Sequence, residues 1–276
     1  MWIFFAILSA LFSGITSIFA KIGLSNIDTD IATGIRTIII LFFSLIFFLI
    51  TGETINNVSI YIILSGITTA LLWICYFKAL YYADVNRVTP IDKTSIILTL
   101  LLSYMLFKEE ITYTKIISII LILLGTYLMV DIKNNKTNSK WIIYAILTSI
   151  FTSLITIFGK YGMSNLSINA SILIRSFIAF IIIWIYIFIK RKHKLLRTLE
   201  KRNTIYIILS SFTTWLSWLF YFNALNKGET SIVFTIEKLS IVVTITLSTL
   251  ILKEKLAKKS IIGLIIILFS TILLII

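Results

Sequence analysis

Six charged side chains lie inside stretches that are otherwise apolar, where an ionised group is costly unless it has a partner or a function. They are Arg36, Asp92, Lys93, Arg175, Glu237 and Lys238. A carboxylate at such a position can gate a polar pathway, bind a cation or carry a proton, whereas a guanidinium binds oxyanions through its fork of N–H donors. These residues are therefore candidates for substrate binding or gating within a membrane.

A structural role competes with this interpretation. Arg36 and Asp92 are expected at similar depth in neighbouring segments, and Arg175 and Glu237 are their equivalents further along the chain. A local ion pair in each case would fix two helices together instead of serving a substrate. Asp92 and Lys238 are expected to approach opposite membrane faces, so we expect no direct bridge between them.

Aromatic side chains form a second set of candidates, at Trp73, Tyr76, Trp218 and Tyr221. Residues three apart share one face of a helix, so each Trp–Tyr pair makes one aromatic patch. Such a patch can line a cavity for a ring or a cation. It can equally belong to the interfacial belt of a membrane protein, where Trp and Tyr are abundant.

Several functional classes have no support in the sequence. There is no HExxH, Walker or GxSxG motif, so we expect neither an enzyme nor catalytic residues. Cys75 and His193 are the only residues of their types, so we expect no cysteine metal cluster, no metal site and no cofactor. The net charge of +13 falls in short loops between apolar stretches, which argues against a nucleic-acid partner.

The elements that must position these residues are membrane-spanning helices. Hydrophobic residues make up 59% of the chain and the mean hydropathy is +1.03, above a soluble domain's usual composition. A span needs roughly 20 apolar residues. The expected spans are about 2–21, 30–50, 59–80, 87–107, 112–131, 141–160, 168–189, 204–225, 231–252 and 259–276.

The chain repeats itself. Residues 2–26 return at 141–165 with 12 of 25 positions identical, and residues 60–80 return at 205–225 with 14 of 21 identical. Five spans in each copy force the second copy into the bilayer upside down, an arrangement common in secondary transporters. The expected fold is an all-α membrane protein of ten transmembrane helices, built as two inverted five-helix repeats.

Loop charges predict an orientation. Basic residues gather at 131–140, 190–202 and 253–259, whereas the loop 51–57 has none. The three basic loops follow the fifth, seventh and ninth spans and so share one face. The excess of Lys and Arg in cytoplasmic loops then places both termini outside.

Two segments carry a resemblance to a known family. Residues 76–112, YFKALYYADVNRVTPIDKTSIILTLLLSYMLFKEEIT, and 221–257, YFNALNKGETSIVFTIEKLSIVVTITLSTLILKEKLA, resemble the EamA-type branch of the drug/metabolite transporter superfamily. The resemblance implies one five-helix unit over 1–135 and another over 139–276. It also implies a cavity bounded by spans 1, 3, 4, 6, 8 and 9, structural glutamates at Glu109 and Glu254, and, against the loop charges, cytoplasmic termini.

The expected function is a secondary transporter that moves a small polar metabolite, anionic or zwitterionic, by alternating access. Basic groups outnumber acidic ones in the apolar stretches, which favours an anion; an Asp92 free of Arg36 would reverse that preference. The alternatives are an exporter of organic cations or drugs, or a non-transporting scaffold or lipid-modification subunit. The expected partners are a small solute and the bilayer, with possible proton coupling, in the plasma (inner) membrane.

Overall fold

The computed structural model of the protein describes residues 1–273 apart from 26, 56, 109, 111, 130–139 and 164–165. Regular structure in that part of the chain is helical throughout. The helices are α1 (Trp2–Gly23), α2 (Thr29–Thr51), α3 (Ile60–Tyr82), α4 (Val85–Lys93), α5 (Ser95–Phe107), α6 (Tyr113–Met129), α7 (Lys140–Gly162), α8 (Ile168–Ile189), η1 (Lys192–Thr198), α9 (Lys201–Lys227), α10 (Thr230–Lys238), α11 (Ser240–Ile251) and α12 (Lys258–Leu273).

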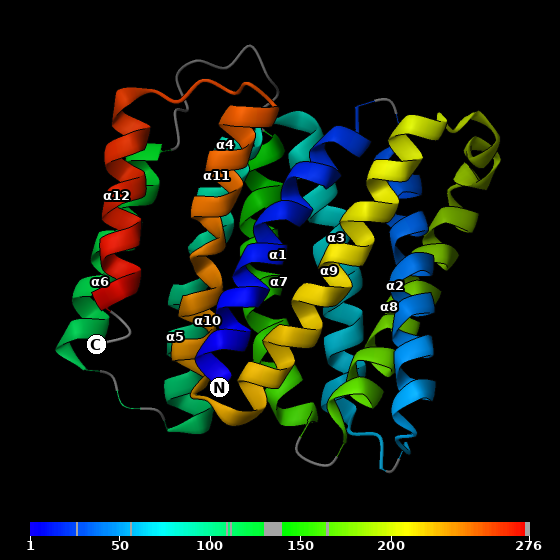
Figure 1. Cartoon of the computed structure of the whole chain (residues 1–276), viewed down its shortest axis with the longest axis horizontal. Helices are drawn as coiled ribbons and strands as arrows, with labels where there is room; N and C mark the ends of the chain where they lie inside the picture. The colour runs from blue at the N-terminus through cyan, green and yellow to red at the C-terminus, as the bar shows by residue number, and fades with distance from the viewer. Residues whose placement is uncertain are drawn as a thin grey trace.

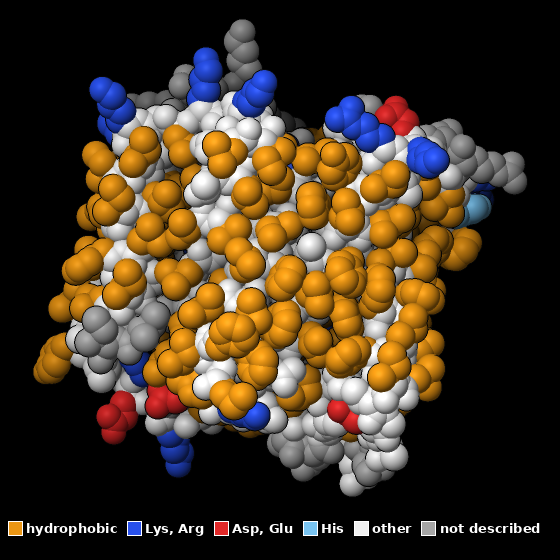
Figure 2. Space-filling model, viewed as in Figure 1, with side chains coloured by type: hydrophobic (Ala, Val, Ile, Leu, Met, Phe, Trp, Pro, Cys, Tyr) orange, Lys and Arg blue, Asp and Glu red, His pale blue; other side chains and the backbone are white. Residues whose placement is uncertain are grey.

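The outer surface suits a lipid bilayer. Eight helical segments of the described chain are long and apolar enough to cross a membrane, counting α4 with α5 and α10 with α11. The remaining apolar helices, α6 and α12, are shorter, at 17 and 16 described residues. Figure 2 shows a broad belt of hydrophobic side chains, with Lys and Arg gathered along its upper edge.

The two segments expected as continuous spans at 87–107 and 231–252 are each divided. Thr94 separates α4 from α5, and Leu239, its equivalent in the second repeat, separates α10 from α11. At both breaks the backbone tightens into i→i−3 hydrogen bonds, Thr94 N–H to Ile91 O and Leu239 N–H to Ile236 O, each 3.0–3.1 Å. Pro90 is not the cause, because the second repeat has Thr235 at that position.

The two halves of the chain pack into each other. Helix α1 lies along α9 and α3 along α7, so each of these contacts joins the first repeat to the second. Helices α2 and α8, and α6 and α12, also pair across the repeats, the latter pair standing at one end of the bundle in Figure 1. The interface between the repeats is therefore built from helices of both.

The α6–α12 pair depends on glycine. A Cβ at Gly125 would lie 2.7 Å from the carbonyl oxygen of Gly263, and a Cβ at Gly263 would lie 2.5 Å from that of Gly125. Ser270 adds a hydrogen bond of 2.8 Å from its Oγ to the carbonyl of Ser118. Small residues let the two backbones touch, which is a common basis of helix association in lipid.

Polar contacts anchor the start of α4. The carboxylate of Glu254 accepts hydrogen bonds from the backbone N–H groups of Val85 (3.1 Å) and Asn86 (3.0 Å), which have no partner within the helix. Lys21 Nζ donates to the carbonyls of Leu80 and Ala83 just before it. The structural role that the resemblance implies for Glu254 fits this contact, while Glu109 lies outside the described residues.

Candidate functional site

A cavity of about 160 Å³ lies between the two repeats. This is roughly ten times the 10–15 Å³ that one water molecule needs. Its walls come from α1, α3 and α4 and their equivalents α7, α9 and α10, with one arginine each from α2 and α8. All the residues singled out from the sequence line it: Arg36, Trp73, Tyr76, Asp92, Lys93, Arg175, Trp218, Tyr221, Glu237 and Lys238.

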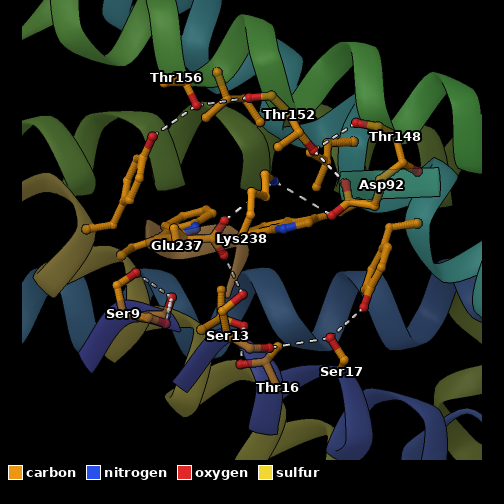
Figure 3. Close-up of a pocket in the computed structure, with 18 of the residues that line it drawn as sticks. Ser9, Ser13, Thr16, Ser17, Asp92, Thr148, Thr152, Thr156, Glu237 and Lys238 are labelled. Carbon is orange, nitrogen blue, oxygen red and sulfur yellow. Dashed lines mark hydrogen bonds and ion pairs between the residues drawn. The ribbon is translucent and has the colours of Figure 1, made fainter. Parts of the chain in front are cut away.

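The ionic groups meet at the centre of this cavity (Figure 3). Lys238 Nζ lies 3.9 Å from Asp92 Oδ2 and 3.4 Å from Glu237 Oε2. Lys93 Nζ also lies 3.9 Å from Asp92 Oδ2, and it donates a 2.7 Å hydrogen bond to Ser240 Oγ. Both lysines are buried, and each is paired with at least one carboxylate of the same cluster.

The expectation that Asp92 and Lys238 stay apart was wrong. Helices α4 and α10 are nine residues long, and nine residues rise about 13–14 Å, close to half of a hydrocarbon core of about 30 Å. Figure 1 places α4 towards one end of the bundle and α10 towards the other. Two short helices that enter from opposite ends meet at the middle, which brings Asp92 and Lys238 to the same level.

Hydroxyl groups hold the carboxylates in the same way in both repeats. Ser13 Oγ donates to Glu237 Oε1 at 2.8 Å, and Thr152, the equivalent of Ser13, donates to Asp92 Oδ1 at 3.1 Å. Figure 3 shows both bonds reaching from the flanking helices α1 and α7 into the cavity. The remaining carboxylate oxygens face the lysines, so the acids are oriented from two sides.

The two tyrosines also make equivalent hydrogen bonds in the two repeats. Tyr76 OH donates to Ser17 Oγ at 2.8 Å, and Tyr221 OH donates to Thr156 Oγ1 at 3.1 Å. Ser17 and Thr156 are equivalent positions of α1 and α7. The phenol of each repeat is thus fixed against the first helix of its own repeat, and both rings line the cavity.

The tryptophans stack on each other across the repeats. The rings of Trp73 and Trp218 have centroids 5.2 Å apart and an interplanar angle of 8°. Arg36 Cζ lies 5.2 Å from the Trp73 ring centroid, and Arg175 Cζ lies 3.7 Å from that of Trp218. Trp73 is only 2% exposed, so it packs inside the protein and not against lipid.

The arginines do not form the ion pairs with Asp92 and Glu237 that a purely structural role would require. Arg36 donates to Ser210 Oγ (2.9 Å) and to Thr214 Oγ1 on α9, and not to Asp92. Arg175 has its cation–π contacts with Trp218 and Phe222 instead of a bond to Glu237. The reason is that α2 packs against α9 and α8 against α3, while lysines occupy the carboxylates.

Comparison with known proteins decides the family. Residues 1–131 and 139–276 each match the EamA-like transporter family. The chain belongs to the EamA-like transporter family. A curated relative of this transporter is an "uncharacterized transporter in cobO 3'region" from Sinorhizobium sp, 34% identical over 134 residues, which is 46% of this chain and 95% of that protein.

A solved structure shares the fold of this EamA-like transporter. The structure titled "Crystal structure of protein" superposes with a TM-score of 0.71 at 10% sequence identity, over 97% of this chain and 94% of that one. At that identity the likeness concerns the fold alone. The family name and the relative's name both describe transporters, which is the class of protein expected from the repeats.

Sequence reasoning left several lining residues of the transporter out. Ser9 and Thr148 lie one helical turn before Ser13 and Thr152 and line the cavity with them. A count of hydroxyls at a spacing of four along 9–17 and 148–156 could have found both. Hydroxyls four apart also include Thr214 (with Ser210) and Ser217 (with Thr213), whereas the lining residue Thr89 carries no comparable signal.

The transporter's site has the composition of a binding site. The described residues hold no group of three or more His, Cys, Asp or Glu that could ligate a metal. What converges on the cavity is two carboxylates, four cations, a pair of indoles and a ring of hydroxyls. Such a set can hold a small polar molecule by charge, hydrogen bonds and ring contacts.

Proposed function

We propose that this EamA-like protein is a secondary transporter that carries a small anionic or zwitterionic metabolite across the plasma membrane by alternating access. The observation that carries the proposal is the charge balance of the central cavity. Arg36, Arg175, Lys93 and Lys238 face Asp92 and Glu237, which leaves an excess of two positive charges. A buried excess charge is costly unless a ligand of opposite charge compensates it.

The ion-pair partners of Asp92 strengthen the preference for an anionic or zwitterionic solute. Asp92 is not bonded to Arg36, and a free carboxylate would have favoured a cationic solute. Lys93 and Lys238, however, occupy Asp92 at 3.9 Å each, and Thr152 donates to its other oxygen. The acids are thus already compensated within the protein, and the uncompensated groups are the two guanidiniums.

The architecture that would support alternating access is ten spans in two inverted five-helix repeats. Equivalent contacts in the two halves give each conformation a counterpart of nearly equal energy, facing the opposite side. The tightened turns at Thr94 and Leu239 divide the cavity-lining spans at equivalent positions. A 3₁₀ turn inside a helix is a common place for bending.

Flux into liposomes tests the proposal. The purified full-length protein would be reconstituted and assayed with radiolabelled amino acids, dicarboxylates and phosphorylated metabolites, beside organic cations. We expect saturable flux for at least one anion or zwitterion, with empty liposomes as the background. Imposing a pH gradient in the same vesicles asks whether protons drive the flux.

Two results would contradict the proposal. Flux of organic cations alone would favour a cation exporter, with Asp92 and the Trp73–Trp218 rings as its binding groups. No flux for any class, with protein that remains folded in the vesicles, would favour a non-transporting membrane scaffold or lipid-modification subunit.

A further inference from the structure

Arg175 is a buried cation for which the described part of the chain offers no hydrogen-bond acceptor. Its side chain lines the cavity and is 2% exposed, and Nε, Nη1 and Nη2 have no acceptor among the described residues. A guanidinium that is cut off from bulk water and has no acceptor in the protein around it carries a large unfavourable desolvation energy. An acceptor from outside the chain would remove that cost.

The equivalent arginine of the first repeat is in a different state. Arg36 donates to Ser210 Oγ at 2.9 Å and to Thr214 Oγ1, so only its Nε lacks an acceptor. The two repeats have arginine at the same position, yet the Arg36 guanidinium is held by protein acceptors and the Arg175 guanidinium is open, with no acceptor among the described residues. The asymmetry points to Arg175 as the group that receives a ligand in this conformation.

Neighbouring side chains position Arg175 for an oxyanion. Its Cζ lies 3.7 Å from the ring centroid of Trp218 and 4.4 Å from that of Phe222. Stacking on a ring engages the face of the guanidinium and leaves its N–H donors available in the plane. The cavity's own carboxylates, Asp92 and Glu237, are paired with lysine and do not neutralise Arg175.

We propose that Arg175, supported by Trp218, binds the carboxylate or phosphate group of the transported solute. This inference rests on the proposed function and narrows it to solutes that carry an oxyanion. Two parallel N–H···O bonds from the fork to either group would satisfy donors that are now unpaired.

Thermal unfolding of the full-length protein in detergent tests the site. Sodium phosphate and sodium acetate are the probes, with sodium chloride at matched ionic strength as the reference. We expect at least one oxyanion to raise the melting temperature, because a ligand that prefers the folded state stabilises it. Arg175→Gln should abolish the shift, while Lys194→Gln, which removes an exposed charge on the short helix η1, should retain it.

Phosphate and acetate distinguish a phosphate ligand from a carboxylate ligand. Arg175→Lys is the second variant, which keeps the test valid if Arg175→Gln does not fold. The lysine keeps the charge but lacks the fork, so the apparent affinity should fall about tenfold or more. An unchanged shift in both variants, or no shift in the wild type, overturns the site. Anion flux in liposomes that Arg175→Gln leaves intact would overturn the site and leave transport standing, whereas absent wild-type flux overturns transport itself.

A second inference comes from two hydroxyl residues of α3 that hold no arginine in this conformation. Ser65 and Thr69 on α3 are the repeat equivalents of Ser210 and Thr214 on α9. Thr69 Oγ1 donates to Ser65 O at 2.7 Å, as Thr214 Oγ1 donates to Ser210 O at 2.8 Å. Ser65 Oγ, however, is fully buried and has no partner among the described residues.

The backbone of Arg175 is close to Ser65 and Thr69. A Cβ at Gly66 would lie 3.1 Å from the backbone carbonyl oxygen of Arg175, so its backbone touches the turn that carries Ser65. We infer that Ser65 and Thr69 hold Arg175 in the opposite-facing conformation, while Arg36 leaves Ser210 and Thr214. The two arginines would then exchange the open and the held state in each transport cycle.

Paired substitutions test the exchange. Ser65→Ala with Thr69→Val should slow flux about tenfold or more and leave the anion-induced thermal shift unchanged, because the conformation that binds at Arg175 does not use these hydroxyls. The matched pair Ser210→Ala with Thr214→Val should release Arg36 and alter both readouts. Unchanged flux in the Ser65/Thr69 variant, or equal losses of flux and shift, would overturn the exchange.

Discussion

Trp73 and Trp218 occupy equivalent positions of the two repeats and stack on each other, with planes 8° apart and centroids 5.2 Å apart. Equivalent residues that touch must lie at the seam between the repeats. Each indole has an arginine near its ring, Arg36 by Trp73 and Arg175 by Trp218. The stack therefore links the two guanidiniums, and a shift of one repeat against the other moves both.

Trp218→Ala should weaken anion binding. The substitution removes the ring under Arg175, a cation–π contact of about 2 kcal/mol in a desolvated site, which corresponds to roughly a thirtyfold loss of affinity. Trp218→Phe keeps a smaller ring and should lose less. The apparent affinity from flux saturation measures both, and equal values for Ala and Phe would contradict a role for the ring.

Lys238→Met should destabilise the protein strongly. Lys238 lies 3.9 Å from Asp92 and 3.4 Å from Glu237, and its loss leaves two partly buried carboxylates, 16% and 13% exposed, with one lysine. Breaking a buried pair costs about 3–5 kcal/mol. The double substitution Asp92→Asn with Lys238→Met should recover part of that loss of unfolding free energy in detergent, and strictly additive losses would contradict coupling between the two residues.

Lys192→Met should loosen the loop that follows α8. Lys192 Nζ bonds Asp28 Oδ2 at 2.7 Å and Asp30 Oδ2 at 2.6 Å, and Asp28 also caps α2. Burial alone would lower the pKa of Lys192, but the hydrogen bonds to Asp28 and Asp30 raise it to about 12. Because Lys192 is 30% exposed, we expect a loss of only about 1 kcal/mol after solvent screening.

The sign of its pH dependence follows from the raised pKa. A lysine whose folded pKa exceeds its unfolded value of 10.5 contributes fully below pH 10.5, and that contribution fades as the pH rises through about 12. The stability difference between wild type and Lys192→Met should therefore be constant from about pH 6 to 9. Thermal melts across that range measure it, with Lys194→Met as the exposed control, and a difference that disappears by pH 9 would contradict the assignment.

Gly125→Leu should separate α6 from α12. Its Cβ would lie 2.7 Å from the carbonyl oxygen of Gly263, and a backbone atom cannot rotate away. Overpacking of this kind costs about 1–3 kcal/mol of unfolding free energy. Tyr127→Leu, on an exposed position of the same helix, is the control, and equal stability of the two variants would argue against close helix contact.

Much of the molecule followed from the sequence alone. The repeats, the apolar segments and the family could all be recognised in the sequence. The bilayer dictates the length and polarity of a membrane-spanning helix, and a duplication leaves a constant spacing between matching residues. The ionisable residues were legible as well, since charge inside an apolar segment is rare. The direction of the termini, predicted outside from loop charges, stays a prediction.

Only the tertiary structure decided which charges meet. The sequence suggested that Arg36 pairs with Asp92 of its own repeat. In the structure α2 packs against α9, and Arg36 donates to Ser210 and Thr214 instead. Asp92 was expected far from Lys238, but the nine-residue helices α4 and α10 enter from opposite ends and meet at the centre. Partner choice depends on how helices of different repeats lie against one another, and a pattern along one chain records the faces of each helix but not the helix that each face will meet.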